Sequence, residues 1–464
     1  MTITATRTEL DKHRDLNSDA SAVKSVKARI ADSGVEYLYY QIVTLTGRVV
    51  GKVVPARHLM RNVENGVQAH PGVVADLQVD DSGAMLGGSP ERGECVVLPD
   101  LDSFGVLPWD HRTGFFFCRM YEPGHAPGDA GGRPVPTDVR GNLRRVHASF
   151  TQRTGLEMRS GVEPEVTWEV PGVPTRHRPG TPHTMYHVEH MEQLRPIYQK
   201  VMEYGQALGL DMVESNCEDP GQLELNWMFD HADLTADRLV LHRQICRRVA
   251  HEAGATVNFM PKPADDKMGN GCHHNISLWD GDRNVLVDPE VPGLHLTETG
   301  KHALGGVLTH AAASTAVMGP TVNSYKRYRH TGQFAPLEIN WGMDNKTCAV
   351  RMPANGRLEI KSPDSMVNPY LSHAVLVAAV EDGLTHAIDP GTPRTTGTGV
   401  PSRFGSLPLT LQDALGLFAE DQAVAQGLGP ELSDLFLRLK TQEWERFSSS
   451  VTDWEREMYG AEGC

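Results

Sequence analysis

Two glutamates, Glu163 and Glu165, stand two positions apart in the stretch RSGVEPEVTWEV. The apolar and β-branched residues around them predict a strand, and residues i and i+2 of a strand point to the same face. Two carboxylates on one face repel each other, which raises their pKa. The pair therefore fits one of two settings: an open, solvated surface, or a site where a cation lies between the carboxylates.

Further polar groups of this kind follow along the chain. The stretch CEDPGQLELNW predicts a turn and a strand, which would fold Glu218 back toward Glu224. In GNGCHHNISLW, a strand would place His273 and Asn275 on one face. Taken singly, a loop carboxylate, a strand carboxylate or a lone histidine is more often structural than functional.

A third pattern is the alternation of charge in RLEIKSP, where Arg357, Glu359 and Lys361 would share one strand face. This pattern is typical of a surface ladder of ion pairs, and also of a metal-binding carboxylate between cations that hold phosphates. Carboxylates with one histidine suit a hard divalent ion such as Mg²⁺ or Mn²⁺. Two such sites would take their ligands from one histidine and five glutamates: Glu163, Glu165, Glu218, Glu224, His273 and Glu359.

Cations complete the set of candidate residues. Lys326, Arg327 and Arg351 lie in the stretches NSYKRY and VRMP. Together with the carboxylates, they favour phosphoryl transfer from a metal–nucleotide complex, a reaction catalysed mainly by positioning and charge neutralisation. The sequence has no GxxxxGK[ST] motif, so the P-loop nucleotide fold is excluded.

The elements that must position these residues form an α+β pattern. Residues 1–20 are polar, and we expect them to be mobile. The alternating segment 35–59 predicts a hairpin, further strands follow up to residue 122, and we expect an all-strand small domain there. A segment rich in Gly and Pro, 124–138, predicts the boundary with a larger domain over residues 123–464, where strands and helices alternate.

Composition limits the class of protein. The chain has 464 residues and a formal net charge of −15, which argues against nucleic acid or an anionic membrane as the main partner. The seven cysteines contain no CxxC pair, so neither a disulfide framework nor a zinc finger is indicated. The N-terminus has no apolar signal segment, and no run approaches the roughly 20 apolar residues of a membrane span. We therefore expect a cytoplasmic protein.

Taken in order, the motifs resemble those of the glutamine synthetase family. The most specific stretch is ADRLVLHRQICRRVAHEAGATVNFMPKP, followed by GNGCHHNISLWD. The ExE strand, the GQxE turn, NSYKR, RMP, RLEIK and NPYL also stand in the family's order. The resemblance implies a β-grasp-like N-terminal domain over residues 21–122, and a catalytic domain built on a curved antiparallel sheet with helices.

The resemblance also implies roles for individual residues. Glu165, Glu218 and Glu224 would hold one Mg²⁺ or Mn²⁺ ion, and Glu163, His273 and Glu359 a second ion near the phosphates of ATP. Glu218 rather than the adjacent Cys217 is assigned to this ion on chemical grounds, because a hard ion prefers a carboxylate to a thiol. The remaining candidates are assigned to L-glutamate (Gly269, Arg327, Lys361) and to the nucleotide (Phe229, Asn275, Ser277, Arg351, Arg357), with Arg327, Arg351 and Glu359 as the catalytic set. Active sites of the family lie between subunits, so we expect rings of six, usually doubled to a dodecamer.

Departures from the family pattern point to the acceptor. Met268 replaces an asparagine that contacts the amino group of glutamate, and Lys346 and Lys361 replace arginines. In RHTGQFAP, Phe334 replaces the flap glutamate that binds ammonium and accepts its proton. An apolar acceptor pocket favours an organic amine, as in the γ-glutamylanilide, γ-glutamylmethylamide and γ-glutamylpolyamine synthetases, with arylamines fitting better than alkylamines. The alternatives are an ordinary glutamine synthetase with an altered flap, and a catalytically silent member with a structural or regulatory role.

Overall fold

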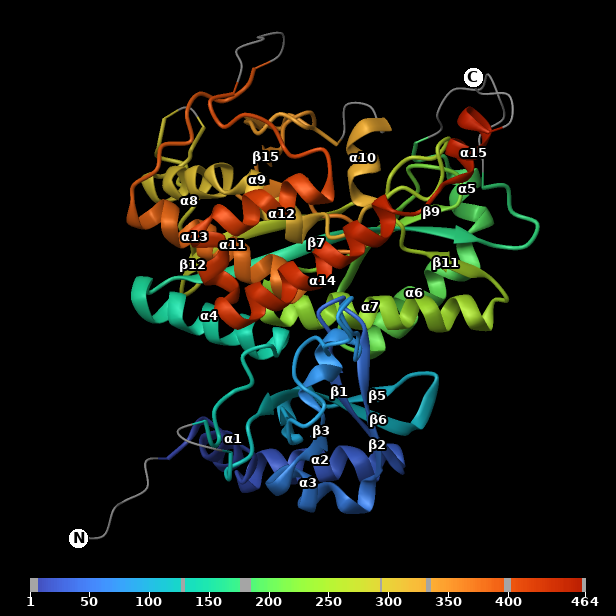
Figure 1. Cartoon of the computed structure of the whole chain (residues 1–464), viewed down its shortest axis with the longest axis vertical. Coiled ribbons are helices and arrows are strands. Elements are labelled where there is room, and N and C mark those ends of the chain that lie inside the picture. The colour runs from blue at the N-terminus through green and yellow to red at the C-terminus, as the bar shows by residue number, and fades with distance from the viewer. Residues whose placement is uncertain are drawn as a thin grey trace.

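The computed structural model describes residues 7–126, 130–175, 185–292, 294–330, 335–395 and 402–460. It is an α+β structure with two sheets, as the sequence predicts, and the smaller, N-terminal sheet lies beneath the larger one (Figure 1). None of the helices in these ranges combines the length and the apolar character needed to cross a membrane.

The N-terminal sheet has the strand order β2-β1-β6-β4-β3, with β5 added to β6. Strands β1 and β6 are parallel, and the other pairs are antiparallel. The predicted hairpin over residues 35–59 is confirmed as β1 and β2. The strands are β1 (Tyr37–Val43), β2 (Val49–Pro55), β3 (Val67–Ala69), β4 (Cys95–Pro99), β5 (Gly105–Leu107) and β6 (Asp110–Tyr121).

Two expectations for this region are wrong. The small domain is not all-strand, because helices α2 (Ala20–Ser33) and α3 (Leu59–Asn65) pack beside the sheet. The predicted mobility of residues 1–20 does not hold for the described part, where α1 (Glu9–Asn17) begins with a capping box between Thr8 and Asp11. Helix α1 buries His13, whose Nδ1 lies 3.0 Å from the Tyr121 hydroxyl, so it is fixed to the sheet.

The larger sheet has the order β14-β15-β16-β12-β7-β9-β8, with β10 and β11 added to β7 and β13 added to β12. Its pairs are antiparallel except β14 and β15, which are parallel. The strands are β7 (Glu157–Glu169), β8 (Met212–Asn216), β9 (Gln222–Trp227), β10 (Asp230–His231), β11 (Thr256–Asn258), β12 (Cys272–Asp280), β13 (Arg283–Asn284), β14 (Trp341–Met343), β15 (Val350–Met352) and β16 (Leu358–Ile360).

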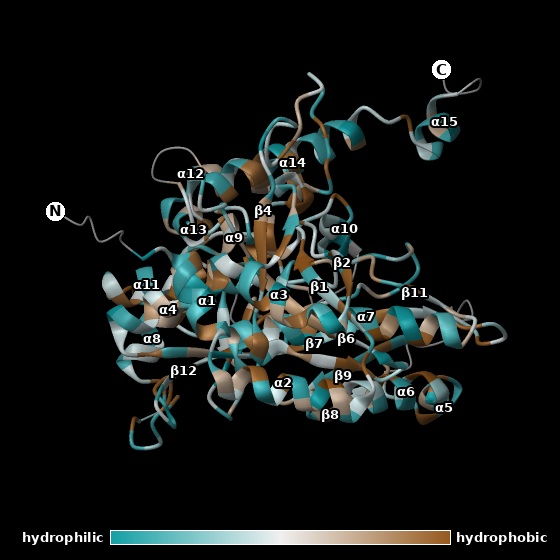
Figure 2. Ribbon diagram, turned by 90° about the horizontal axis from the view of Figure 1, so that it is seen from below, coloured by the Kyte–Doolittle hydropathy of each residue, from teal (hydrophilic) through white to brown (hydrophobic). Residues whose placement is uncertain are grey.

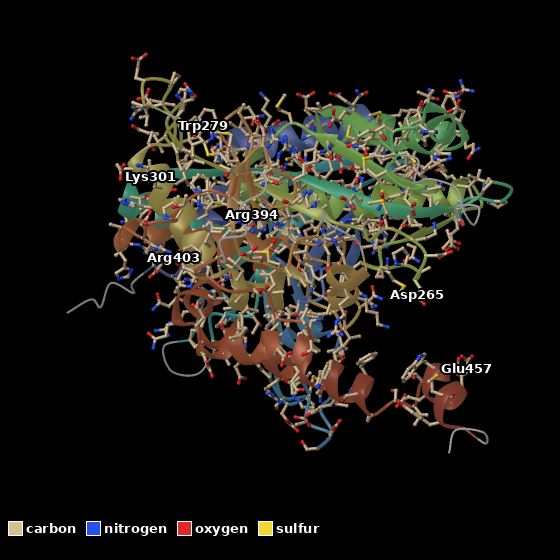
Figure 3. All side chains as sticks on the ribbon, turned by 90° about the horizontal axis from the view of Figure 1, so that it is seen from above. Asp265, Trp279, Lys301, Arg394, Arg403 and Glu457 are labelled. Atoms are coloured by element: carbon tan, nitrogen blue, oxygen red, sulfur yellow. The ribbon has the colours of Figure 1, made fainter. Side chains whose placement is uncertain are left out.

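Helices cover this sheet and lead to the C-terminus. They are α4 (Val139–Thr154), α5 (Val188–Gln193), α6 (Arg195–Ala207), α7 (Ala232–Glu252), α8 (Glu298–Thr309), α9 (Ala311–Met318), α10 (Ser324–His330), α11 (Pro369–Thr385), α12 (Leu411–Glu420), α13 (Gln422–Leu428), α14 (Pro430–Ser448) and α15 (Asp453–Tyr459). Helix α11 is apolar and buried, as predicted, whereas α15, which carries Glu457, lies apart from the rest of the chain (Figures 2 and 3).

The central strand β12 is fixed from its helix-facing side. The His274 side chain is fully buried, its Nε2 lies 2.8 Å from the Ser372 hydroxyl of α11, and its ring stacks on His373. Because side chains alternate along a strand, this anchoring turns His273 and Asn275 to the opposite face. The predicted division of the chain at residues 122 and 123 remains a prediction, since sheet membership does not show that either part folds alone.

Candidate active site

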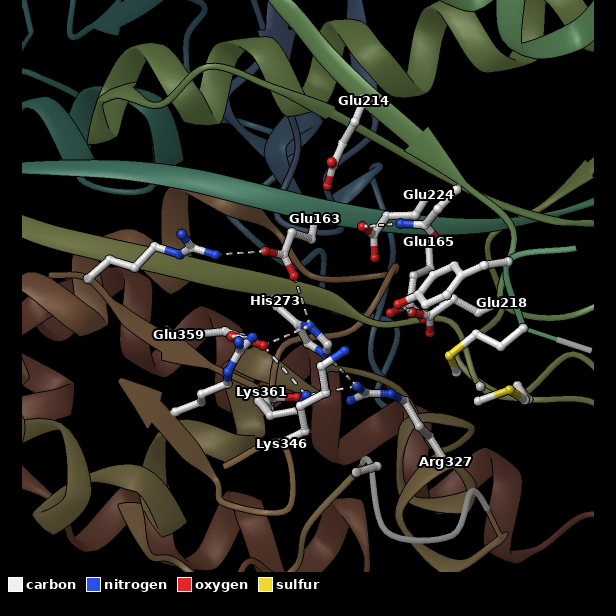
Figure 4. Close-up of a pocket in the computed structure, with 18 residues that line it drawn as sticks. Glu163, Glu165, Glu214, Glu218, Glu224, His273, Arg327, Lys346, Glu359 and Lys361 are labelled. Carbon is white, nitrogen blue, oxygen red and sulfur yellow. Dashed lines mark hydrogen bonds and ion pairs between the residues drawn. The ribbon is translucent and has the colours of Figure 1, made fainter. Parts of the chain in front are cut away.

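Adjacent strands bring the candidate residues of the sequence into register on one face of the larger sheet. Glu163 of β7 is paired with His273 of β12, and Glu165 of β7 with Glu224 of β9. On the other side of β12, Asn275 is paired with Glu359 of β16. All of these side chains except Asn275 line one cavity of about 220 Å³ (Figure 4). The paired glutamates of the ExE strand therefore face an enclosed site rather than open solvent.

The most compact cluster in this cavity consists of Glu163, His273 and Glu359. Among the described residues, only this set places three ligand atoms within 4.8 Å of one another. Nδ1 of His273 lies 3.2 Å from Oε2 of Glu163 and 3.6 Å from Oε1 of Glu359. Two carboxylates and an imidazole nitrogen suit a hard divalent ion, so the residues present fit Mg²⁺ or Mn²⁺.

Glu163 is held in its ionised form. Burial opposes ionisation, but the hydrogen bonds to His273 and Asn275 and the charge of Arg357 lower the pKa of Glu163 to about 2. Nδ2 of Asn275 donates to Glu163 at 2.9 Å, and Nε of Arg357 donates to Oδ1 of Asn275 at 2.7 Å. Asn275 therefore links the candidate metal ligand to a cation that can bind phosphate.

Two cations flank Glu359: Arg351, its paired residue on β15, and Lys361, two positions further along the chain. Nη1 of Arg351 donates to Oε2 of Glu359 at 2.9 Å, and Nζ of Lys361 lies 3.5 Å from Oε1. Arg351 also donates to Asp344. The alternating charges of RLEIKSP therefore line a cavity rather than an open surface, and the role of Glu359 as a metal ligand between phosphate-binding cations stays a prediction.

A second group of carboxylates, Glu165, Glu218 and Glu224, lines the same cavity. Burial raises the pKa of Glu224 well above its ordinary value, and the charges of Glu163 and Glu165 raise it further. Burial and Glu165 also raise the pKa of Glu218. Carboxylates under such repulsion favour a bound cation. Cys217 instead donates to the Asp219 carbonyl and does not line the cavity, in keeping with the choice of Glu218.

Arg327 closes the floor of the cavity. Its guanidinium is buried, donates to the Lys361 carbonyl at 3.2 Å, and lies 3.5 Å from Nε2 of His273. Gly271 permits this arrangement, because a Cβ at that position would lie 2.8 Å from Nη2 of Arg327 and 3.1 Å from Oε1 of Glu165. Gly269 also lines the cavity, and its carbonyl accepts from Gln222.

The nucleotide candidates continue along the same face of β12. Ser277 is buried, and its hydroxyl accepts from Nε1 of Trp279 at 2.8 Å. Phe229 is half-exposed and stacks on Trp279 with ring centroids 5.8 Å apart, at the edge of the molecule (Figure 3). Alternate residues of β12 thus run from His273, beside the carboxylates, to Trp279, which stacks on Phe229. This order suits a nucleotide, with its phosphates near the carboxylates and its planar base near the aromatic rings.

Most predicted site residues therefore meet in one place. Eleven of them line the cavity: Glu163, Glu165, Glu218, Glu224, Gly269, His273, Arg327, Arg351, Arg357, Glu359 and Lys361. Asn275 contacts this group, while Ser277 and Phe229 lie beyond it and do not line it. Phe334 lies outside the described residues, so its place in an acceptor pocket remains a prediction.

Five residues that line the cavity were not predicted from the sequence: the apolar Met185 and Ala335, and the polar Tyr186, Glu214 and Asn216. The Tyr186 hydroxyl donates to Glu218 at 3.1 Å, and Nδ2 of Asn216 donates to Glu224 at 2.9 Å. Glu214 and Asn216 stand at i and i+2 on β8, the same spacing that singled out Glu163 and Glu165. Nothing in the local sequence marks Tyr186, which reaches the site from a loop.

A sheet face that combines a carboxylate–histidine cluster, flanking arginines and an aromatic pair fits a metal- and nucleotide-dependent phosphoryl-transfer enzyme. Comparison with known proteins agrees. The chain belongs to the glutamine synthetase family, because residues 136–459 match its catalytic domain, "Glutamine synthetase, catalytic domain". Members of this family are ATP-dependent ligases that use divalent metal ions, and this chain is a ligase of the family.

The relatives include both glutamine synthetases and a ligase named for an organic amine, methylamine. A glutamine synthetase of Rhizobium leguminosarum bv. phaseoli is 31% identical over 447 residues, covering 92% of this chain and 97% of the relative. A glutamate–methylamine ligase of Methyloversatilis universalis is 30% identical, covering 93% and 97%. A solved structure described as "Apo GmaS without ligand" superimposes with a TM-score of 0.82 at 31% identity, covering 92% of this chain and 97% of the other.

Proposed function

We propose that this protein joins the γ-carboxylate of L-glutamate to an organic amine, with ATP as the energy source. A γ-carboxylate oxygen attacks the terminal phosphorus of ATP, the bond to ADP breaks, and γ-glutamyl phosphate forms. The amine nitrogen then attacks the acyl carbon, phosphate leaves, and the nitrogen loses a proton. The products are a γ-glutamyl amide, ADP and phosphate.

The chain's own residues hold the reactants for the first step. Arg351 and Arg357 line the cavity on either side of Glu359 and Glu163, where they can neutralise the phosphate oxygens. Arg327 and Lys361 are positioned to bind the carboxylates of glutamate, and Gly269 offers a backbone contact beside them. Glu163, His273 and Glu359 would hold Mg²⁺ or Mn²⁺, which supplies positive charge next to the phosphates.

The acceptor side of the cavity carries the proposal of an organic amine. Three apolar side chains line the cavity together with Tyr186 and Glu218: Met185, Met268 and Ala335. Ala335 is buried and directly follows Phe334, which by the family resemblance stands at the position of the flap glutamate that binds ammonium. An apolar wall favours the carbon skeleton of an amine, whereas ammonium gains little from it. The glutamate–methylamine ligase among the relatives supports the same acceptor class.

The test is release of phosphate from ATP with L-glutamate, Mg²⁺ and a panel of acceptors: ammonia, methylamine, aniline and putrescine. We expect an organic amine to give a higher kcat/KM than ammonia. Turnover with ammonia alone would make the protein an ordinary glutamine synthetase. Absence of turnover with every acceptor, in a protein that still binds ATP, would support the catalytically silent alternative.

The proposal includes self-association into rings of six, single or doubled, with two or more divalent ions per active site. Helix α15 supports an assembled protein, because it stands apart from its own chain with Trp454 and Tyr459 59% and 66% exposed (Figure 2). Light scattering coupled to size-exclusion chromatography tests this, and a monomer at micromolar concentration would contradict it.

A further inference from the structure

A second cavity, of about 330 Å³, lies between the tip of the β1–β2 hairpin, helix α7 and helix α14. Figure 1 shows the hairpin reaching up to these two helices. The hairpin is fixed there, because Nδ2 of Asn368 donates to the carbonyls of Thr44 and Leu45 at 3.1 and 3.0 Å. This cavity shares no lining residue with the active-site cavity, so it is a separate site.

Positive charge gathers around this second cavity. Arg48, Arg243, Arg247 and Lys440 line it, against a single acidic residue, Glu443. Glu443 already accepts from Lys440 at 2.7 Å. In the part of the chain that the structure describes, no ion pair involves any of the three arginines. Three arginines around a cavity whose one acidic lining residue is already paired with Lys440 stand out in a protein whose net charge is −15.

Arg243 is the fixed member of the group. It is 6% exposed, and its Nη2 donates to the carbonyls of Ser365 and Val367 at 2.9 and 2.7 Å. Nη1 lies beside the hairpin, where a Cβ on Gly47 would approach it to 3.3 Å. Burial and the charge of Arg247 lower the pKa of Arg243, while Cys272 and Asp364 act in the opposite direction without cancelling the shift. An anion beside it would compensate both effects.

Arg247 and an apolar wall complete the site. The Arg247 guanidinium lies over the Phe259 ring at 4.9 Å from its centroid, which leaves its edge available for planar hydrogen bonding. Phe259, Val317, Leu371 and Phe436 line the rest of the cavity. Guanidinium groups bind carboxylate and phosphate oxygens in a bidentate manner, and the apolar wall suits a short carbon chain.

We propose that the cavity between the hairpin tip, α7 and α14 binds a small oxyanion, a carboxylate or a phosphate, through Arg48, Arg243 and Arg247. The site is joined to the active site by the backbone. Ser365, whose carbonyl accepts from Arg243, donates its own amide to the Asn270 carbonyl at 3.2 Å, and Gly269 next to it lines the active-site cavity. A bound anion therefore acts on a segment that the substrates contact.

Isothermal titration calorimetry of the full-length protein with inorganic phosphate and with succinate tests this inference. The titrations are made in the Arg357→Ala background, which weakens phosphate binding in the active site, and the part of the signal that is lost on Arg247→Ala or Arg48→Ala is assigned to the second site. Arg247→Ala and Arg48→Ala should each weaken binding of the preferred anion about 10-fold, since each removes a charge-assisted contact. Tighter binding of succinate than of phosphate would identify a carboxylate ligand, and the reverse order a phosphate ligand.

The matched control is Arg248→Ala, which removes the same charge from the next position of α7. Arg248 pairs with Glu252 and does not line the cavity, so binding should not change. Equal loss in Arg247→Ala and Arg248→Ala would reduce the effect to net charge. That result, or the lack of saturable binding of either anion up to about 10 mM, would overturn the inference. The readout is binding alone, so it is independent of whether the proposed amine ligase activity is found.

Discussion

Glu163 and His273 face each other across strands β7 and β12, with Nδ1 of the imidazole 3.2 Å from Oε2 of the carboxylate. The sheet register alone produces this contact, since neither residue sits on a loop. Glu359, from the strand on the other side of β12, completes the cluster. Three neighbouring strands thus preorganise the candidate ligand set, which would reduce the cost of assembling it around an ion.

The first prediction concerns this cluster. Glu163→Gln and Glu359→Gln should each lower phosphate release by at least about 100-fold, because each removes a charged ligand from the candidate metal site. Both variants should remain folded, since the amide keeps the shape of the side chain and its oxygen can still accept from Asn275 or Arg351. Phosphate release with saturating Mg²⁺, together with Mn²⁺ binding followed by electron paramagnetic resonance, measures both effects.

A suitable control is Glu298→Gln, because Glu298 is exposed on α8 and pairs only with neighbouring residues of its own helix. It should behave as the wild type in both assays. Wild-type turnover of Glu163→Gln or Glu359→Gln would contradict the assignment of these residues as metal ligands.

A second prediction follows from the crowding around Gly271. In Gly271→Ala, the new Cβ would lie 2.8 Å from Nη2 of Arg327 and 3.2 Å from Nε2 of His273, so these groups must move apart. We expect kcat/KM for glutamate to fall on the order of 100-fold, as for other displacements of about 1 Å in an active site. Gly93→Ala is the control, because a Cβ there meets nothing within 4 Å. Equal kinetics of the two variants would mean that the floor of the cavity tolerates displacement.

The residues of the active-site cavity show which features the sequence can predict and which it cannot. Alternation along a strand is local, so the shared faces of Glu163 with Glu165, and of Arg357 with Glu359, were predictable from spacing. That pattern does not say which strands are neighbours in the sheet. The grouping of residues from different strands into one site came from the family resemblance. Contacts from loops, such as that of Tyr186 with Glu218, leave no periodic signal at all.

Helix α1 shows a different reason for failure. Its composition is polar, and on composition alone we expected the segment to be mobile. The buried residues Leu10, His13 and Asn17 recur at helical spacing, but two of the three are polar and hydrogen-bond to Tyr121 and Pro99. An apolar-periodicity rule does not detect a helix that is fixed to the sheet by polar contacts.

A third prediction concerns pH and stability at His310, which joins α8 and α9 and lies between two carboxylates. Its Nδ1 lies 2.7 Å from Asp421, and its Nε2 lies 3.0 Å from Asp382. Burial opposes protonation, but these two hydrogen-bonded charges raise the pKa of His310 above its ordinary value of 6.5. A raised pKa in the folded state means that the contribution to stability is complete below pH 6.5 and is lost as pH rises through the folded-state pKa.

His310→Gln should therefore lower Tm at pH 6 and lower it less at pH 9, as measured by differential scanning fluorimetry with saturating Mg²⁺ at both pH values. His111→Gln, which changes an exposed histidine of β6, is the control and should leave the pH dependence unaltered. An equal loss of Tm for His310→Gln at both pH values would show that His310 contributes packing and neutral hydrogen bonds rather than charge.

The fourth prediction concerns acceptor choice at Phe334. In an ammonia-using enzyme, a glutamate at this position would attract ammonium and accept its proton, whereas phenylalanine supplies neither charge nor base. Help from a general base is typically worth 10²–10⁴-fold, and its loss penalises ammonium more than an amine that is already neutral at the working pH. The ring also offers apolar surface, worth about 25 cal/mol per Å² to any amine that covers it. Phe334→Glu should therefore raise the ratio of kcat/KM for ammonia to that for the best organic amine.

Phe334→Leu separates this explanation from a packing effect, because it keeps an apolar side chain and adds no charge. We expect Phe334→Leu to leave the acceptor ratio close to that of the wild type, even if both rates fall. If Phe334→Glu and Phe334→Leu lower activity toward every amine by a similar factor, Phe334 only packs the segment before Ala335 against the body. The acceptor would then be selected by the other apolar side chains that line the cavity, Met185, Met268 and Ala335. In that case Met268→Asn, which restores the residue of the family pattern, is the variant that must change the ratio.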